Sequence, residues 1–189
     1  MKIRARNFKH VFLTALLFMG IAACDGPKPE SVPLATVQHV DLERYLGRWY
    51  EIAKIPNRFQ RQCVSDASAN YVRNTDGTIA VVNRCRIRDG QFDEARALAR
   101  VVDPRSNAKL EVSFFSVLGW RPIWGNYWVL ALGPDYDYAV VGEPGRRYGW
   151  ILARAPTLPA ATRARIDRQL RELGYQPEQF ENSPQSAER

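Results

Sequence analysis

Cysteine and histidine, which most often serve as nucleophiles, metal ligands or general bases, are few in this chain of 189 residues. The thiols are Cys24, Cys63 and Cys85, and the imidazoles are His10 and His39. No histidine follows residue 40, so the rest of the chain lacks the side chain used most often for acid–base catalysis and metal binding. There is also no glycine-rich phosphate loop and no Gly-x-Ser-x-Gly elbow. The sequence therefore predicts no enzyme, no metal site and no cofactor.

The first 23 residues have the composition of an export signal. Four basic residues and no acid lie in residues 1–10, and an almost unbroken apolar run follows in 11–23. A helix of about 13 residues rises about 20 Å, too short for a hydrocarbon core of about 30 Å, which favours a cleaved signal over a membrane-spanning helix. Cleavage would lower the formal net charge from +7 to +3. Without a dense basic run, nucleic acid is not an expected partner.

The end of this signal, Ile21-Ala22-Ala23-Cys24, resembles the lipobox of bacterial lipoproteins. The resemblance implies that the Cys24 thiol is lipidated, for example with palmitate, and that several acyl chains together anchor the protein to a membrane. The alternative is an ordinary secretory signal with an incidental cysteine. We expect a bacterial envelope location, at the outer membrane facing the periplasm. The inner membrane stays an alternative, because Asp25 resembles a retention signal.

The other two cysteines, Cys63 and Cys85, would be exported into an oxidising compartment. An even pair of cysteines forms a disulfide there by default. The bond would close a loop of about 22 residues and stabilise the fold by about 3 kcal/mol. The alternatives are two free thiols or a metal pair, although neither cysteine has a histidine or another cysteine nearby in the sequence.

The elements that must position these residues are mainly short strands. From residue 41 the chain alternates apolar segments with turn residues, and Asp76-Gly77 and Asp89-Gly90 predict tight hairpins. Apolar residues at helical spacing then predict one helix behind Pro159, ended by Gly174. We expect eight strands, which suit an up-and-down barrel: 47–55, 64–73, 78–88, 91–102, 109–116, 127–132, 138–142 and 149–155.

Four segments are predicted along the chain. Residues 1–23 are the lipoprotein signal peptide, and residues 24–40 are the lipidated N-terminus with a proline-rich, flexible tether. Residues 41–180 form the barrel and its helix, and residues 181–189 form a disordered tail.

Residues 41–53, with Gly47 and Trp49 at their centre, resemble the first sequence block of the lipocalin family, whose core is Gly-x-Trp. Residues 135–138 resemble the second block of that family, and residues 150–154 the third. The resemblance covers about residues 41–175 and is to the bacterial, outer-membrane lipoprotein and apolipoprotein D-like branch. It implies an all-β fold, an eight-stranded antiparallel up-and-down β-barrel (a calyx) with one C-terminal α-helix packed outside.

The resemblance also implies roles for single residues. Gly47, Trp49 and Arg154 would close the narrow end, with the guanidinium stacked on the indole. We interpret Glu51, turned inward by alternation from Trp49, as part of a polar network at that end, with Arg154 or Arg100 as its partner. Alternation and the family pattern place seven side chains in the calyx: Ala53, Tyr71, Val112, Phe114, Tyr127, Trp150 and Leu152.

The open end of the barrel would be formed by loops. Trp120 and Trp124 would guard the mouth there or touch a membrane, or else pack against neighbouring loops. Arg121, Arg146 and Arg147 would attract a carboxylate or phosphate head group, or else be merely solvated.

We therefore expect a membrane-anchored lipocalin that binds and stores or transports lipids of the fatty acid or lysophospholipid class. Haem-like and isoprenoid ligands also suit such an interior. Homodimerisation is left open. Two alternatives differ in class: a structural envelope lipoprotein whose barrel is filled, and an enzyme that isomerises or de-epoxidises an apolar substrate.

Overall fold

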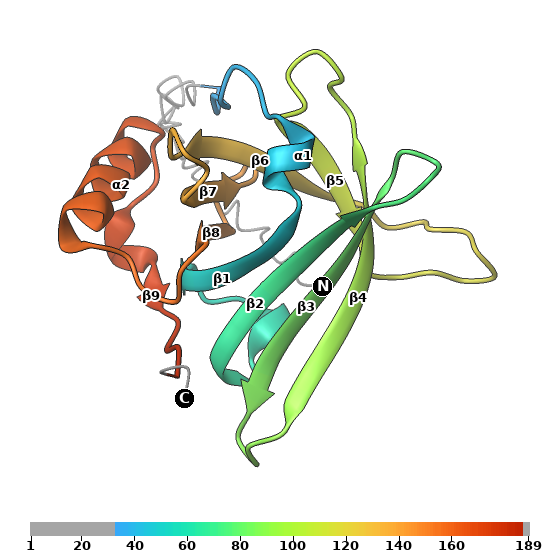
Figure 1. Cartoon of the computed structure of the whole chain (residues 1–189), viewed down its shortest axis with the longest axis horizontal. Helices are drawn as coiled ribbons and strands as arrows, with labels where there is room; N and C mark the ends of the chain where they lie inside the picture. Colours follow the sequence, from blue (N-terminus) through green and yellow to red (C-terminus); the bar gives the residue numbers. More distant parts are fainter. Residues whose placement is uncertain (1–32, 187–189) are drawn as a thin grey trace, which may run out of the picture. The chain divides into compact units, whose positions relative to one another are not determined.

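The computed structural model describes residues 33–186, in which eight antiparallel strands form a closed barrel (Figure 1). Each strand pairs with its sequence neighbour, and pairing of the first strand with both the second and the eighth closes the cylinder. The prediction of an eight-stranded up-and-down barrel is confirmed. The strands are β1 (Gly47–Lys54), β2 (Cys63–Arg73), β3 (Ile79–Ile87), β4 (Phe92–Val101), β5 (Lys109–Ser113), β6 (Gly125–Leu132), β7 (Tyr138–Gly142) and β8 (Gly149–Ala153).

Short helices precede and follow the strands. α1 (Leu42–Tyr45) begins at Asp41, whose carboxylate accepts hydrogen bonds from the backbone N–H groups of Glu43 and Arg44. The turn η1 (Arg58–Gln60) lies between β1 and β2, and η2 (Pro177–Gln179) precedes a ninth short strand, β9 (Glu181–Asn182). None of the helices in residues 33–186 is long and apolar enough to cross a membrane.

The expected C-terminal helix is α2 (Ala160–Glu172), which packs against the outside of the barrel. It buries Ile166 and Leu170 completely, against outward-facing side chains of β6, β7 and β8. Gly174 follows with a φ of +78°, a conformation that ends helices and favours glycine. The barrel wall thus lies between two apolar clusters, one inside it and one under α2.

The prediction of a flexible tether is wrong for residues 33–40. Leu34 and Val40 are buried, and the backbone N–H groups of Val37 and Val40 donate to the carbonyls of Val129 and Ser106. The apolar residues at every third position give this segment a face that packs on the barrel, which its proline-rich composition obscured. The export signal, Cys24 and Asp25 lie outside the described residues.

The prediction of a disordered tail is also wrong for residues 181–186. β9 pairs with the second half of β1, on the edge that β2 leaves as it bends away at its register shifts. Beyond β9, the Gln185 side chain donates to the carbonyls of Glu51 and Ala67, and so bridges β1 and β2. Unpaired strand edges need covering, and the tail supplies that cover through backbone bonds that its polar sequence did not reveal.

Asp66 of β2 holds the last part of this tail. Its carboxylate accepts hydrogen bonds from the Arg86 guanidinium (2.8 Å) and from the N–H (2.6 Å) and hydroxyl of Ser186. Burial alone would raise the pKa of Asp66, but these hydrogen bonds, with one from Ser65, lower it to about 2.

The narrow end is closed by Trp49, which is completely buried and donates its indole N–H to the Tyr45 carbonyl. The Arg154 guanidinium lies 3.8 Å from the ring centroid and donates to the carbonyls of Arg44, Leu46 and Arg48. Gly47 has a φ of +85°, and a Cβ there would lie 3.6 Å from the guanidinium. The structure therefore brings Gly47, Trp49 and Arg154 together at this end of the barrel.

We expect Trp49→Ala to lower the free energy of unfolding by about 3–5 kcal/mol, because it leaves a cavity beneath Arg154. Urea unfolding followed by circular dichroism would measure the change. Trp120→Ala, which alters an exposed tryptophan, is the matched control. Equal stability of the two variants would contradict the role assigned to Trp49.

We expect Asp66→Asn to lower the free energy of unfolding at pH 7 by about 1 kcal/mol. The folded pKa of about 2 lies below the value of about 3.9 for an unfolded aspartate, so the carboxylate stabilises the fold above pH ~4 and loses this effect as the pH falls through about 2. Urea unfolding at several pH values should show the two proteins converging in acid. Asp135→Asn, at an exposed site, should change nothing; a constant difference down to low pH would contradict the assignment.

Candidate functional site

The barrel encloses a cavity of about 780 Å³. Its wall is mainly apolar, and its mouth lies between the β1–β2, β5–β6 and β7–β8 connections. The volume and lining are typical of sites for small apolar ligands. Six of the seven predicted calyx residues line it: Tyr71, Val112, Phe114, Tyr127, Trp150 and Leu152.

Ala53, the seventh, does not line the cavity and is a wrong prediction. It is completely buried on the other side of the wall, in the cluster under α2. The pairing of β1 with β8 shifts register between Glu51 and Ala53. Such a β-bulge inserts one residue and reverses the inward–outward alternation, so counting by twos from Trp49 fails beyond it.

Three tyrosines form the inner end of the cavity, which we call the tyrosine floor. The Tyr127 hydroxyl lies 2.7 Å from that of Tyr45 and 2.9 Å from that of Tyr71. Burial raises the pKa of Tyr71 to about 12 and the pKa values of Tyr45 and Tyr127 well above the usual value. The floor is therefore uncharged. Tyr45 was missed because α1 carries it and no strand periodicity marks it.

The mouth includes Arg58 and Arg147. Arg84 also belongs to the lining, but its guanidinium stacks on the Phe92 ring of β4, 3.7 Å from the centroid. Only Arg147 was expected at the mouth. Of the other predicted rim arginines, Arg121 donates to the Ser113 carbonyl and Arg146 to the Leu173 carbonyl beside α2. Arg58 lies on η1, so its position does not follow from strand counting.

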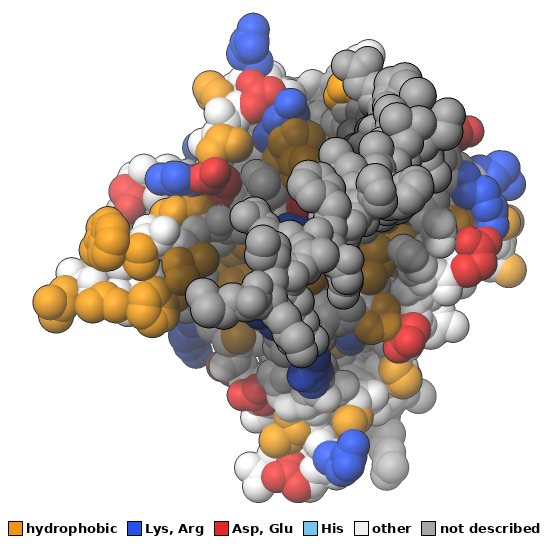
Figure 2. All heavy atoms as spheres, turned by 180° about the vertical axis from the view of Figure 1, so that it is seen from behind, with side chains coloured by type: hydrophobic (Ala, Val, Ile, Leu, Met, Phe, Trp, Pro, Cys, Tyr) orange, Lys and Arg blue, Asp and Glu red, His pale blue; other side chains and the backbone are white. Residues whose placement is uncertain are grey.

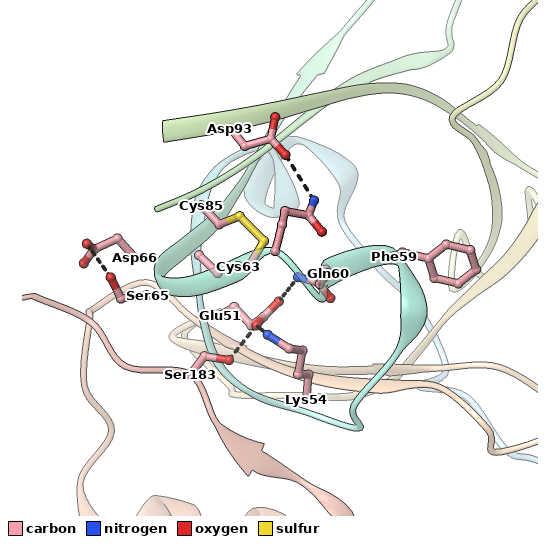
Figure 3. Close-up of a disulfide and its surroundings, with 12 residues drawn as sticks. Glu51, Lys54, Phe59, Gln60, Cys63, Ser65, Asp66, Cys85, Asp93 and Ser183 are labelled. Atoms are coloured by element: carbon pink, nitrogen blue, oxygen red, sulfur yellow. Dashed lines mark hydrogen bonds and ion pairs between the residues drawn. A yellow bond between two sulfur atoms is a disulfide. The ribbon is translucent and has the colours of Figure 1, made fainter. Parts of the chain in front are cut away.

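Glu51 lines the cavity and is 5% exposed. Its carboxylate accepts hydrogen bonds from Lys54 Nζ (2.7 Å), Gln60 Nε2 (2.6 Å) and Ser183 Oγ (2.5 Å) (Figure 3). The predicted partners are wrong, because Arg154 donates to backbone carbonyls and Arg100 pairs with Glu111. Glu51 thus ties η1 and the C-terminal tail to β1, rather than acting at the narrow end.

The disulfide between Cys63 and Cys85 joins β2 to β3 in the cavity wall (Figure 3), as predicted. It fixes one end of the β1–β2 connection, and the bond between Glu51 and Gln60 fixes its middle. This connection therefore has a defined position over the mouth. No three residues among His, Cys, Asp and Glu come together in residues 33–186 in a way that could hold a metal ion.

The β5–β6 loop (residues 114–124) projects from the barrel and carries exposed apolar side chains (Figures 1 and 2). Reciprocal backbone hydrogen bonds between Val117 and Trp120 order its tip, where Leu118 is fully exposed and Trp120 is 69% exposed. Trp120 therefore does not pack against neighbouring loops. Trp124 lies at the mouth, with the Arg100 guanidinium 4.1 Å from its ring.

Comparisons with known proteins agree with this geometry. A family model described as a lipocalin-like domain matches residues 40–185. The chain is 39% identical over 160 residues to temperature-induced lipocalin-1 of Arabidopsis thaliana, covering 83% of this chain and 86% of that protein. It is 37% identical over 139 residues to the outer membrane lipoprotein Blc of Escherichia coli (strain K12), covering 73% and 75%.

Apolipoprotein D of Rattus norvegicus is 38% identical over 134 residues, which are 66% of each chain. Among solved structures, insecticyanin from the tobacco hornworm Manduca sexta superposes with a TM-score of 0.65 at 21% identity, covering 83% of this chain and 86% of that one. This similarity shows the fold.

Proposed function

Because the chain belongs to the lipocalin family, we propose that it is a membrane-anchored lipocalin that binds and stores or transports lipids in the cell envelope, without catalysing a reaction. The observation that carries the proposal is the cavity of about 780 Å³, which has a mainly apolar wall and opens between three loops. A cavity of this size suits an elongated apolar molecule. The structural alternative requires a barrel filled by its own side chains, and a cavity of this size argues against it.

The fatty acid or lysophospholipid class is supported by the polarity of the mouth. Arg58 and Arg147 lie at an opening above an apolar interior. Guanidinium pairs well with carboxylate and phosphate oxygens. A lipid whose chain enters the barrel would leave its acidic head group beside these arginines.

Membrane anchoring through Cys24 stays a proposal from the sequence. It is supported by the names of relatives such as the outer membrane lipoprotein Blc. On this basis we propose an envelope location, with the outer membrane preferred to the inner.

We also propose that the β5–β6 loop touches the bilayer surface. Residues 114–124 contain no acid and one basic residue, Arg121, and their apolar side chains project beside the cavity mouth. Exposed apolar patches of this kind occur where proteins meet membranes, and tryptophan suits the interface. The mouth would then open near the source of its ligand.

Ligand titration tests the binding proposal. We expect palmitic acid and a palmitoyl lysophospholipid each to quench the tryptophan fluorescence of the delipidated protein. Quenching should saturate at one ligand per protein, with a dissociation constant in the submicromolar to micromolar range. Val112→Trp, which fills the cavity, should weaken binding about tenfold or more, whereas Val82→Trp, whose side chain does not line the cavity, should not. No response to either lipid would favour the structural alternative, and recovery of a chemically altered lipid would favour the enzyme.

Vesicle flotation tests the loop. In a Cys24→Ser background, which removes any acyl anchor, the protein should bind vesicles of phosphatidylethanolamine and phosphatidylglycerol. Leu118→Ser with Trp120→Ser should weaken this binding about tenfold or more, because both side chains lose apolar contact with the bilayer. Val72→Ser, at an exposed apolar site on β2 outside the loop, is the control. Equal loss in both variants, or none in either, would contradict the loop's role.

A further inference from the structure

The inner end of the cavity carries more hydrogen-bond donors than its own contacts use. The hydroxyls of Tyr45, Tyr127 and Tyr71 form a chain in that order, with O···O distances of 2.7 Å and 2.9 Å. Within the part of the chain that the structure describes, these hydroxyls make no other hydrogen bond. Tyr45 and Tyr71 are 4% and 7% exposed, so bulk water does not reach them freely.

The three tyrosines have one more O–H donor than the hydrogen bonds between them use. Each phenol has one O–H donor, so the three residues hold three donors but share only two hydrogen bonds. If the bonds run in one direction along the chain, the spare donor is at Tyr45 or Tyr71. If both outer hydroxyls donate to Tyr127, the spare donor is at Tyr127. Every arrangement therefore leaves one O–H that needs an acceptor.

The spare donor stays protonated at physiological pH. Burial, the largest effect on each residue, raises the pKa of all three phenols, that of Tyr71 to about 12. The ligand atom that contacts the tyrosine floor must therefore accept a hydrogen bond. The tyrosines offer it an O–H donor but no charge.

The surroundings decide which acceptor fits. All three tyrosines line the cavity, and they pack in one cluster with apolar side chains that include Val81, Leu110 and Leu152. Arg154 stacks on Trp49 and donates to three backbone carbonyls, and it acts on Tyr45 and Tyr71 only through its charge, without a hydrogen bond to either. A carboxylate would lose its hydration here in exchange for one hydrogen bond, which is unfavourable. A neutral hydroxyl or carbonyl oxygen loses far less, and it satisfies the donor.

We propose that the tyrosine floor is a binding subsite for a neutral oxygen, a hydroxyl or a carbonyl, at the inner end of an elongated apolar ligand. The inference rests on the proposed lipid-binding function and narrows it. The preferred ligand is a lipid whose chain is oxygenated near its far end. A plain acyl chain would place a methyl group against a buried donor and leave that donor without a partner, which costs affinity.

The test compares matched fatty acids on the delipidated protein by tryptophan fluorescence and calorimetry. We expect ω-hydroxypalmitic acid to bind about five- to tenfold more tightly than palmitic acid, in keeping with one added neutral hydrogen bond. Palmitic acid with a keto group on the penultimate carbon, which can only accept, should share this advantage. The ω-dicarboxylic acid of the same length should bind more weakly than the ω-hydroxy acid.

The triple variant Tyr45→Phe/Tyr71→Phe/Tyr127→Phe removes every donor of the floor at once. Single replacements would not serve: Tyr45→Phe or Tyr71→Phe leaves two linked hydroxyls with one spare donor, and Tyr127→Phe leaves two unlinked hydroxyls with two. The triple variant should bind palmitic acid at least as tightly as the wild type and lose the preference for the oxygenated chains. Tyr50 does not line the cavity, so Tyr50→Phe should keep the preference for the oxygenated chains.

Equal affinity of the wild type for palmitic and ω-hydroxypalmitic acid would overturn this inference and leave the proposed function standing. The same holds if the preference persists in the triple variant. If no fatty acid binds at all, both the proposed function and the inference fail. Should the triple variant not fold, the wild-type series alone decides, since the keto acid tests the direction of the hydrogen bond without any substitution.

Discussion

The closure of the barrel on β1 is the constraint on which the rest of the structure depends. One edge of β1 pairs with β8, and the other edge is divided between β2 over Gly47–Tyr50 and β9 over Ala53–Lys54. A strand with an uncovered edge would invite pairing with another chain. Because β2 diverges from β1 toward the mouth, the closure is complete only when the tail after α2 returns to fill the gap.

This divided edge also explains the positions of the buried polar groups. Where β1 and β2 separate, backbone groups need new partners, and Gln185 supplies a donor to each strand. The Glu51 carboxylate lies at the same place and bonds to η1, β1 and the tail together. The fold tolerates so buried a carboxylate because three side-chain donors, those of Lys54, Gln60 and Ser183, form hydrogen bonds to it. The same residues therefore fill the gap between β1 and β2 and hold the β1–β2 connection over the mouth.

Local patterns in the sequence were sufficient to predict most of the fold. The hairpin turns, the strand alternation and the helix ended by Gly174 each depend on neighbouring residues, and the structure has all of them. Ala53 failed because a bulge changes the phase of a strand without a mark in the residue types. The tail and residues 33–40 failed for another reason: their order comes from bonds to distant strands, which composition does not encode.

The candidate site shows the same division. Tyr71, Val112, Tyr127, Trp150 and Leu152 lie on strands and Phe114 directly follows β5, and alternation with the family pattern placed them in the cavity. Tyr45 and Arg58 were not predicted there, because α1 and η1 bring them to the cavity through tertiary packing. The missed residues complete the two polar ends of the cavity, to which the predicted Tyr71, Tyr127 and Arg147 also belong.

These two ends differ in kind, and the difference follows from where water can reach. At the narrow end, Trp49 and Arg154 exclude solvent, so the polar groups that remain in the cavity are neutral phenols. At the mouth, guanidinium groups stay hydrated and keep their charge at little cost. A ligand that suits both ends would be apolar along its length. It would carry an acidic group at the mouth and at most a neutral polar group at the tyrosine floor. On the function proposed above, the two ends of the barrel would fix the orientation of the ligand as well as its class.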